Sequence, residues 1–196
     1  MGDKPDAPSC ARNREPILEV LRDHFADRRT VLEIGSGTGQ HAIFFAAELP
    51  HLNWQTSDCA GNLAGIQAWL DEGALPNTPA PIRLDVNEPW PATRYDAAFG
   101  ANILHIMSWC EVERLFDCLP GIMAGDFKLV IYGPFNYGGR FTSASNASFD
   151  TSLKEQGVHQ GLRDFDVVNA LAAQAGLNFV EDRAMPSNNR CLVWGR

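Results

Sequence analysis

Short apolar or β-branched runs alternate along the chain with longer stretches whose apolar residues recur at helical spacing. The runs predict strands at residues 30–34, 54–57, 82–84, 97–100, 128–132, 179–182 and 191–194. The longer stretches predict helices at residues 16–25, 40–49, 63–72, 109–119 and 165–175. This alternation is typical of an α/β fold, in which helices cover both faces of a mostly parallel sheet.

Two predicted helices carry boundary signals of their own. Ser108, followed three residues later by Glu111, predicts a capping box at the start of the fourth helix. Asp164 is the expected N-cap of the last helix, and Gly176 is a natural left-handed stop at its end.

One segment departs from the compact alternation. Residues 133–163 are rich in Gly, Ser, Asn and Thr and are too long for a plain connection. An insertion of this kind is usually functional or disordered. Because it follows the fifth strand, we expect it at the carboxyl edge of the sheet, where doubly wound folds bind ligands.

Composition narrows the class of protein. The chain has 196 residues, 45% of them hydrophobic, so we expect a single domain over residues 1–196. Its 16 basic and 24 acidic residues give a net charge of −8, which argues against a nucleic-acid partner. No apolar run is long enough for a membrane span or a signal peptide. Five scattered cysteines without a CxxC pair suggest neither disulfides nor a metal site, so a cytoplasmic protein fits best.

The strongest chemical signal is a glycine loop. The apolar run at residues 31–34 leads directly into Gly35-Ser36-Gly37-Thr38-Gly39 and then into a predicted helix. Glycines let the backbone turn sharply and let a ligand approach without a Cβ in the way. A tight strand-to-helix turn without a ligand would not need three of them.

The spacing of these glycines distinguishes between the common classes of nucleotide-binding loop. A GxGxxG dinucleotide fingerprint would need glycine where Gln40 stands, and a phosphate loop would need a lysine that is absent. The remaining pattern, E-x-G-x-G-x-G, resembles the first motif of the class I S-adenosylmethionine-dependent methyltransferases. The resemblance implies that the cofactor is bound by Glu33, Gly35, Ser36, Gly37, Thr38 and Gly39.

Acidic residues follow the next two predicted strands. Asp58 ends the second strand, where a carboxylate can accept hydrogen bonds from both ribose hydroxyls. Asp85 ends the third, where similar methyltransferases use an acid to accept from the adenine amino group, and the neighbouring Val86 would pack on the ring. Each acid alone would as readily be a turn or cap residue, but their order and spacing together favour a cofactor site.

Further motifs make the resemblance more specific. They are RNREPIL at 12–18, GSGTGQH at 35–41, ANILHI at 101–106, YGPFN at 132–136, SASN at 143–146, RDF at 163–165 and MPSNN at 185–189. Together they resemble the methyltransferase-like 26 family. The resemblance implies a Rossmann-like class I methyltransferase sandwich whose seven-stranded sheet has an antiparallel last strand. It also implies S-adenosylmethionine as methyl donor, an N-terminal segment at residues 1–29 that covers the cofactor, and Asn102 among the cofactor-binding residues.

The acceptor is less constrained than the donor. Enzymes that methylate base nitrogens or glutamine amides commonly carry Asn/Asp-Pro-Pro-Tyr/Phe after the fourth strand, where this chain has Asn102-Ile103-Leu104-His105. With a net charge of −8, we expect a small-molecule acceptor with an O, N or S nucleophile. We expect no nucleic-acid or membrane partner, and a monomer or homodimer.

Catalytic candidates lie after the fourth and fifth strands. Histidine has the unperturbed pKa that suits a base at neutral pH, so His105 is the first candidate for base or substrate orienter. A histidine packed in an apolar run is the alternative. Tyr132 is a catalytic candidate and Asn136 a substrate-binding one, although ordinary strand-end hydrogen bonding would explain both.

Polar residues of the insertion and of the C-terminal part complete the substrate side. Arg163 is a candidate substrate clamp and Asp164 a candidate base, although an N-cap role explains Asp164 equally well. Arg140 could pair with a substrate carboxylate through two hydrogen bonds. Asn188 and Asn189 could bind substrate or only form a hairpin turn.

The N-terminal cations are assigned to the same region. Arg14 is expected to meet the methionyl carboxylate, with help from Gln40 at a helix N-terminus, and Arg12 is expected to bind substrate. A solvated basic turn is the alternative.

Two rival functions remain. An NAD-dependent oxidoreductase would use the same fold, but Gln40 in place of the third glycine speaks against it. The other rival is a cofactor-binding interaction protein that has lost catalysis. The complete glycine loop with Asp58 and Asp85 favours a methyltransferase over both.

Overall fold

The computed structural model describes residues 4–196, so the start of the expected N-terminal segment 1–29 lies outside the described residues. The main sheet has the strand order β3-β2-β1-β4-β5-β9-β8. Strands β1 to β5 pair in parallel, and β9 runs antiparallel to both of its neighbours. The strands are β1 (Thr30–Ile34), β2 (Asn53–Asp58), β3 (Ile82–Arg83), β4 (Tyr95–Ala101), β5 (Met123–Gly133), β8 (Asn178–Met185) and β9 (Asn189–Gly195). The predicted α/β fold and antiparallel last strand are confirmed.

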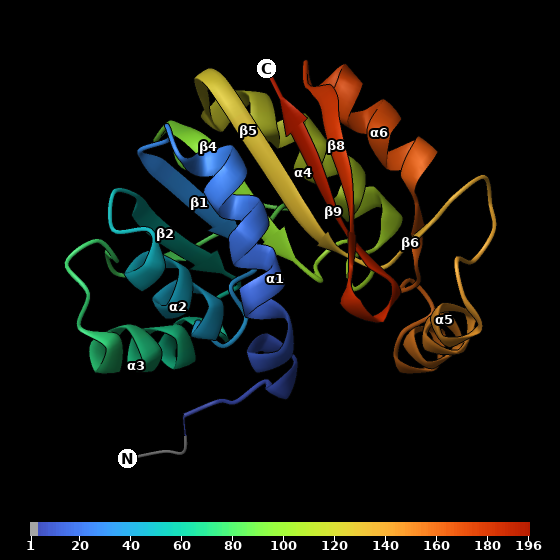
Figure 1. Ribbon diagram of the computed structural model, residues 1–196, viewed down its shortest axis with the longest axis horizontal. Helices are drawn as coiled ribbons and strands as arrows, with labels where there is room; N and C mark the ends of the chain where they lie inside the picture. The colour runs from blue at the N-terminus through green and yellow to red at the C-terminus, as the bar shows by residue number, and fades with distance from the viewer. Residues whose placement is uncertain (1–3) are drawn as a thin grey trace.

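Helices pack on both faces of this sheet (Figure 1). Helices α1 (Pro8–Phe25), α2 (Gln40–Glu48) and α3 (Leu63–Gly73) lie on one face, and α4 (Trp109–Ile122) and α6 (Phe165–Gln174) lie on the other. Side chains alternate across a strand, so neighbouring strand residues enter different cores. Val31 packs with α1 to α3, whereas Leu32 packs with α4 and α6. Within residues 4–196, no helix combines the length and the apolar character that crossing a membrane requires.

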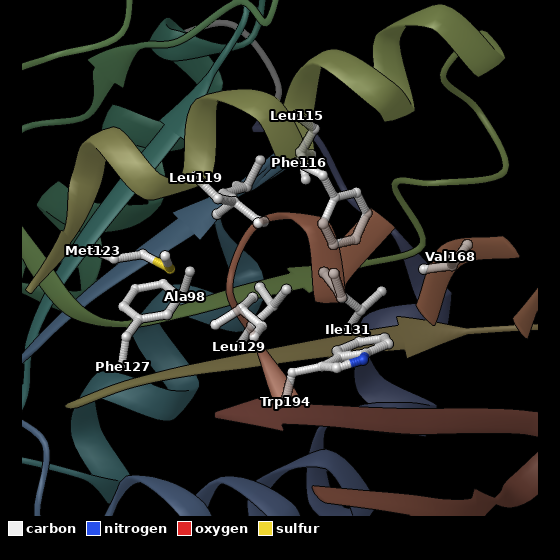
Figure 2. Packing of buried hydrophobic residues seen from close by; sticks show 14 of the residues in the cluster. Ala98, Leu115, Phe116, Leu119, Met123, Phe127, Leu129, Ile131, Val168 and Trp194 are labelled. Carbon is white, nitrogen blue, oxygen red and sulfur yellow. The ribbon is translucent and has the colours of Figure 1, made fainter. Parts of the chain in front are cut away.

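The core beneath α4 illustrates how the helices are held (Figure 2). Phe116 and Leu119 of α4 lie over Leu129 and Ile131 of β5 and Trp194 of β9, and none of the five is more than 1% exposed. Apolar residues three or four apart form one stripe along a helix, and this stripe is the face that α4 buries.

The predicted helix boundaries are largely confirmed. The Ser108 hydroxyl accepts from the Glu111 amide, and the Glu111 carboxylate accepts from the Ser108 amide, which completes the capping box. Asp164 caps α6 by accepting from the amide of Asp166, and Gly176 has a φ of +82°.

The start of α1 is the exception among these boundaries. The predicted start at residue 16 is wrong, because α1 begins at Pro8 and Pro16 lies inside it. The first turns of α1 bury the polar residue Asn13 where a helix usually buries an apolar one. The helical spacing of apolar residues, from which the helix was predicted, is therefore missing there.

The insertion at residues 133–163 has defined structure. It contains β6 (Phe135–Asn136), which pairs in parallel with β7 (Arg163–Asp164), and a helix, α5 (Ala144–Gln156). The buried residues of α5 are Asn146, Asp150 and Leu153, so polar side chains occupy two of the three inward positions. A hydrophobic pattern therefore could not reveal α5.

Polar contacts attach α5 to the rest of the molecule. Figure 1 shows α5 apart from the two helix layers and near the connection between β8 and β9. The side-chain amide of Asn146 donates to the carbonyl of Asn188 in that connection, at 3.2 Å. In the middle of α5, the Asp150 carboxylate accepts from the amide of Leu162 at 2.8 Å and pairs with Lys154.

We expect Asp150→Ala to lower the free energy of unfolding by about 1–3 kcal/mol, because it leaves the Leu162 amide without its acceptor in a buried position. Urea unfolding followed by circular dichroism measures the change. Asp117→Ala, at an exposed position of α4, is the matched control and should change the value by less than about 0.5 kcal/mol. Equal effects of the two substitutions would contradict the role given to Asp150.

Candidate functional site

The carboxyl ends of β1 to β4 meet at one edge of the sheet, where a cavity of about 850 Å³ opens. We call it the first cavity. The chain leaves β1 toward β2 and β3 and then returns to β4 on the other side of β1. Ligands of open α/β sheets bind at such a reversal of strand order, because the two loops diverge there and leave a crevice.

The three glycines of the loop after β1 all have positive φ angles, but their surroundings differ. A Cβ on Gly35 would lie 2.6 Å from Cγ2 of Ile103, and a Cβ on Gly39 would lie 3.1 Å from the Cα of Ile66 in α3. Gly37 has no atom within 4 Å of its missing Cβ and lines the first cavity. Gly35 and Gly39 therefore allow packing, whereas Gly37 leaves space for a ligand.

Asp58 and Asp85 reach the first cavity from the ends of β2 and β3, as predicted. One oxygen of Asp58 accepts from the amide of Gly37 at 2.8 Å, and the other accepts from Cys59 and Asn62. The Asp85 carboxylate accepts from the amide of Asn87 at 2.8 Å. The backbone and side-chain amides that surround these acids hold them in defined positions at the cavity wall.

Most of the predicted cofactor residues line the first cavity together. They are Gly35, Ser36, Gly37, Thr38, Asp58, Asp85, Val86 and Asn102. The sequence reasoning missed other lining residues, among them Cys10, Leu84, Ile106, Met107 and Glu111. Three carboxylates, those of Asp58, Asp85 and Glu111, line this cavity, and no lysine or arginine among the described residues does so.

Glu33, Gly39 and Arg14 do not line the first cavity, although they were predicted to bind the cofactor. Glu33 is 2% exposed beneath the loop, where its carboxylate accepts from the Trp54 indole at 3.0 Å and the Ser36 hydroxyl at 3.1 Å. Burial raises the pKa of Glu33 to about 7, against the lowering effect of these two hydrogen bonds. Glu33 therefore supports the loop from below.

Arg14 and Gln40 have structural partners. The Arg14 guanidinium lies over the ring of Phe44, 4.5 Å from its centre. Gln40 accepts from the amide of Ala7 at 2.7 Å and donates to Asp6 at 2.8 Å, so its side chain anchors the N-terminal residues.

Residues 4–7 form a strap along the first cavity, and Pro5 and Ala7 line it. The carbonyl of Pro5 accepts from the Trp69 indole at 2.7 Å, and Lys4 pairs with Glu72 at 2.5 Å. Gln40 and α3 thus hold the strap at the wall of the first cavity. That the segment 1–29 covers a bound cofactor stays a prediction.

A second cavity of about 800 Å³ adjoins the first. Its wall includes the predicted residues Arg12, Asn102, His105, Tyr132 and Asn188. The wall also includes Asn189, the neighbour of Asn188 in the sequence. Sequence reasoning missed the other lining residues, which are Ser9, Asn13, Pro134, Ser145, Asn146, Phe149, Pro186 and Ser187. All but Ser9 and Phe149 lie in the motifs RNREPIL, ANILHI, YGPFN, SASN and MPSNN, so the motifs outside the glycine loop were the signal that could have found this cavity.

Ser9 and Asn102 line both cavities and therefore mark the junction between them. Asn102 has a φ of +60°, a left-handed conformation that is uncommon outside glycine, and its amide donates to the carbonyl of Tyr132 at 2.8 Å. This bond connects the loop after β4 to the end of β5.

His105 and Tyr132 are both more than nine-tenths covered. Burial, with a smaller effect from Arg163, lowers the pKa of His105 to about 4, so the ring is neutral at pH 7. Its ring meets Phe149 of α5 edge to face, with centres 5.4 Å apart. Burial also raises the pKa of Tyr132, which keeps the hydroxyl protonated.

Four of the predicted catalytic or substrate-binding residues lie outside both cavities. Arg163 donates to the carbonyls of Leu104, Met107 and His159. The two oxygens of Asp164 accept from the amides of Gly139 and Asp166. Asn136 has a buried side-chain oxygen without a hydrogen-bonding partner among the described residues.

Arg140 is the fourth of these residues. It is exposed and pairs through its backbone with Tyr137. None of the four is brought to the candidate substrate side.

Comparison with protein families gives one match over almost the whole chain. A family model described as "Protein of unknown function (DUF938)" matches residues 4–196.

Solved structures of methyltransferases have the same fold. An O-methyltransferase family protein from Burkholderia thailandensis is similar over 96% of this chain and 57% of its own, with a TM-score of 0.84 and 18% identity. An O-methyltransferase family 2 protein from Planctomyces limnophilus, in complex with apigenin, is similar over 93% and 61%, with a TM-score of 0.74 and 14% identity. CalO1, a methyltransferase in calicheamicin biosynthesis solved in its SAH-bound form, is similar over 95% and 53%, with a TM-score of 0.76 and 19% identity. The chain thus spans little more than half of each, and the predicted Rossmann-like class I methyltransferase fold is confirmed.

The pKa of Glu33 predicts a specific pH dependence. A carboxyl with a higher pKa in the folded than in the unfolded protein binds its proton more tightly when folded, so its contribution to stability is lost as the pH rises from about 4.5 to about 7. The free energy of unfolding should therefore fall over this pH range, and we expect Glu33→Gln to remove on the order of 1–3 kcal/mol of that fall. Chemical unfolding at pH 5, 6 and 7 measures the slope, with the exposed Glu155→Gln as control. Parallel slopes for the wild type and Glu33→Gln would refute this.

Proposed function

Because the chain belongs to the DUF938 family and shares its fold with solved methyltransferases, we propose that it is an S-adenosylmethionine-dependent methyltransferase acting on a small molecule. The observation that carries the proposal is the convergence of Gly37, Asp58 and Asp85 on one cavity that adjoins a second. The more specific resemblance to the methyltransferase-like 26 family is part of the proposal.

The first cavity suits S-adenosylmethionine. Asp58 would accept from the ribose hydroxyls, and Asp85 would accept from the adenine amino group while Val86 packs on the ring. The wall holds three carboxylates and, within residues 4–196, no lysine or arginine, which favours a ligand with positive charge. When bound, the cofactor supplies a methyl carbon attached to a sulfonium, which is open to attack by a nucleophile.

Protein groups at the junction would position the acceptor. Transfer to a carbon of this kind depends on proximity, orientation and exclusion of water, and no covalent enzyme intermediate is needed. Ser9 and Asn102 lie where the two cavities meet, and Ile106 and Met107 add apolar cover to the first.

His105 would orient the nucleophile. With a pKa of about 4, its ring is a weak base at neutral pH, but the neutral ring can accept a hydrogen bond from a hydroxyl or amine of the acceptor. Tyr132 would donate a hydrogen bond from its protonated hydroxyl. Arg12 and Asn188 would contact the distal part of the acceptor.

Two of the solved structures with the same fold support a small acceptor. The Planctomyces limnophilus protein is in complex with apigenin, and CalO1 acts in calicheamicin biosynthesis. A cavity of about 800 Å³ is within the range of small-molecule sites.

Calorimetric titration with S-adenosylmethionine, SAH and NAD tests the cofactor. We expect the first two to bind with micromolar affinity and NAD to give no heat of binding. NAD binding alone would replace the proposal with an oxidoreductase, and binding of none of the three would refute a cofactor role for the first cavity.

Gly37→Val should abolish binding of S-adenosylmethionine, because the side chain would project into the first cavity from a residue with a φ of +60°. Gly138→Val is the matched control, since Gly138 has a φ of +55°, equally open surroundings and no place in either cavity wall. Both variants should lose similar stability from the strained backbone, whereas only the first should lose binding in the same calorimetric titration. Retained binding by Gly37→Val would remove the glycine loop from the site.

His105→Gln should leave the affinity for S-adenosylmethionine unchanged, because the ring lines only the second cavity. Transfer of labelled methyl groups into a small-molecule extract should fall at least tenfold. His51→Gln, at an exposed residue outside both cavities, is the control. Unchanged transfer by His105→Gln would leave this histidine a packing role only.

A further inference from the structure

The walls of the two cavities differ in charge. Asp58, Asp85 and Glu111 line the first, and no arginine or lysine of residues 4–196 joins them. The second is lined by Arg12 and, within the same residues, by no aspartate or glutamate. His105, the other titratable nitrogen base in that wall, is neutral at pH 7.

Arg12 is a cation in the wall of the second cavity. Among the described residues, it makes no ion pair and its side chain makes no hydrogen bond, and it is exposed on α1 at the cavity wall. Five other arginines are paired with carboxylates, namely Arg22, Arg28, Arg83, Arg183 and Arg190. Arg29 and Arg140 also make no ion pair with the described residues, but they lie outside both cavities. In a chain with 24 acidic residues and a net charge of −8, an unpaired guanidinium facing a cavity is available for an external anion.

The rest of the second cavity offers neutral hydrogen-bonding groups and one aromatic surface. The neutral polar residues are Ser9, Asn13, Asn102, Tyr132, Ser145, Asn146, Ser187, Asn188 and Asn189. Phe149 of α5 is 40% exposed at this wall. A ligand that fits would combine an anionic group, further polar atoms and a short apolar portion.

We propose that the methyl acceptor is a small hydroxy acid, whose carboxylate binds Arg12 through two hydrogen bonds and whose carbon skeleton packs on Phe149. This inference rests on the proposed function. The charges of the two cavities are complementary to such a pair of reactants, because a cationic donor occupies the acidic cavity and an anionic acceptor the basic one. The attraction between opposite charges would bring the reactants together at Ser9 and Asn102. The hydroxyl oxygen of the acceptor would form the new bond to the methyl carbon as the bond from that carbon to sulfur breaks, SAH would leave, and the hydroxyl proton would pass to the neutral ring of His105.

Paired probes isolate the contribution of the carboxylate. We would titrate the full chain, with and without saturating SAH, with 4-hydroxybenzoate and 3-hydroxybutyrate and with the uncharged amide of each acid. At low salt, at least one acid should bind ten times more tightly than its amide, and added sodium chloride should weaken the difference. Arg12→Gln should remove this preference. Arg29→Gln, at an exposed residue before β1 and outside both cavities, removes the same charge and should keep it.

The possible results test the anion site and the proposed function separately. Equal affinities for acid and amide, no binding of either acid, or equal losses in the two arginine variants would overturn the assignment of the second cavity to an acid. Failure of SAH to bind while the acid preference persists would refute the proposed function and leave the anion site standing, so the two failures are distinguishable.

Discussion

The close approach of the loop after β1 to the loop after β4 is the constraint on which the site depends. Gly35 can lie against Ile103 only because it has no Cβ, which would be 2.6 Å from the isoleucine side chain. Gly35, Ile103 and Asn102 all line the first cavity, and Asn102 also lines the second. The parallel pairing of β1 with β4 aligns the ends of both strands, so the two loops meet at the same edge.

Support for this edge comes from polar groups as much as from apolar packing. Glu33 lies under the glycine loop and accepts from Trp54 and Ser36, while Gln40 binds the N-terminal strap over the cavity. Asp150 holds the far end of the insertion. Buried polar groups of this kind specify one arrangement, because leaving any of them without a partner costs free energy.

Burial also sets the chemistry of the candidate site. The same loss of hydration that raises the pKa of Glu33 to about 7 lowers that of His105 to about 4, since burial disfavours whichever form is charged. The wall of the second cavity therefore holds a neutral imidazole at pH 7 together with the guanidinium of Arg12, whereas three acidic side chains line the first. The charge difference between neighbouring cavities follows from which strand ends and helices reach each one.

The sequence by itself determined the sheet, the glycine loop and the acids after β2 and β3, because these depend on local signals: apolar periodicity, glycines at alternate positions, and a carboxylate at each strand end. It also pointed to Arg12, His105, Tyr132 and Asn188, which lie in short motifs. Only the tertiary structure decided that these residues share one cavity wall with α5, whose inward face is largely polar. It also decided that Glu33, Arg14, Arg163 and Asp164 contact other protein groups and line neither cavity. A polar side chain has the same identity whether it meets a ligand or a backbone group, and only the packing of distant segments determines which of the two it contacts.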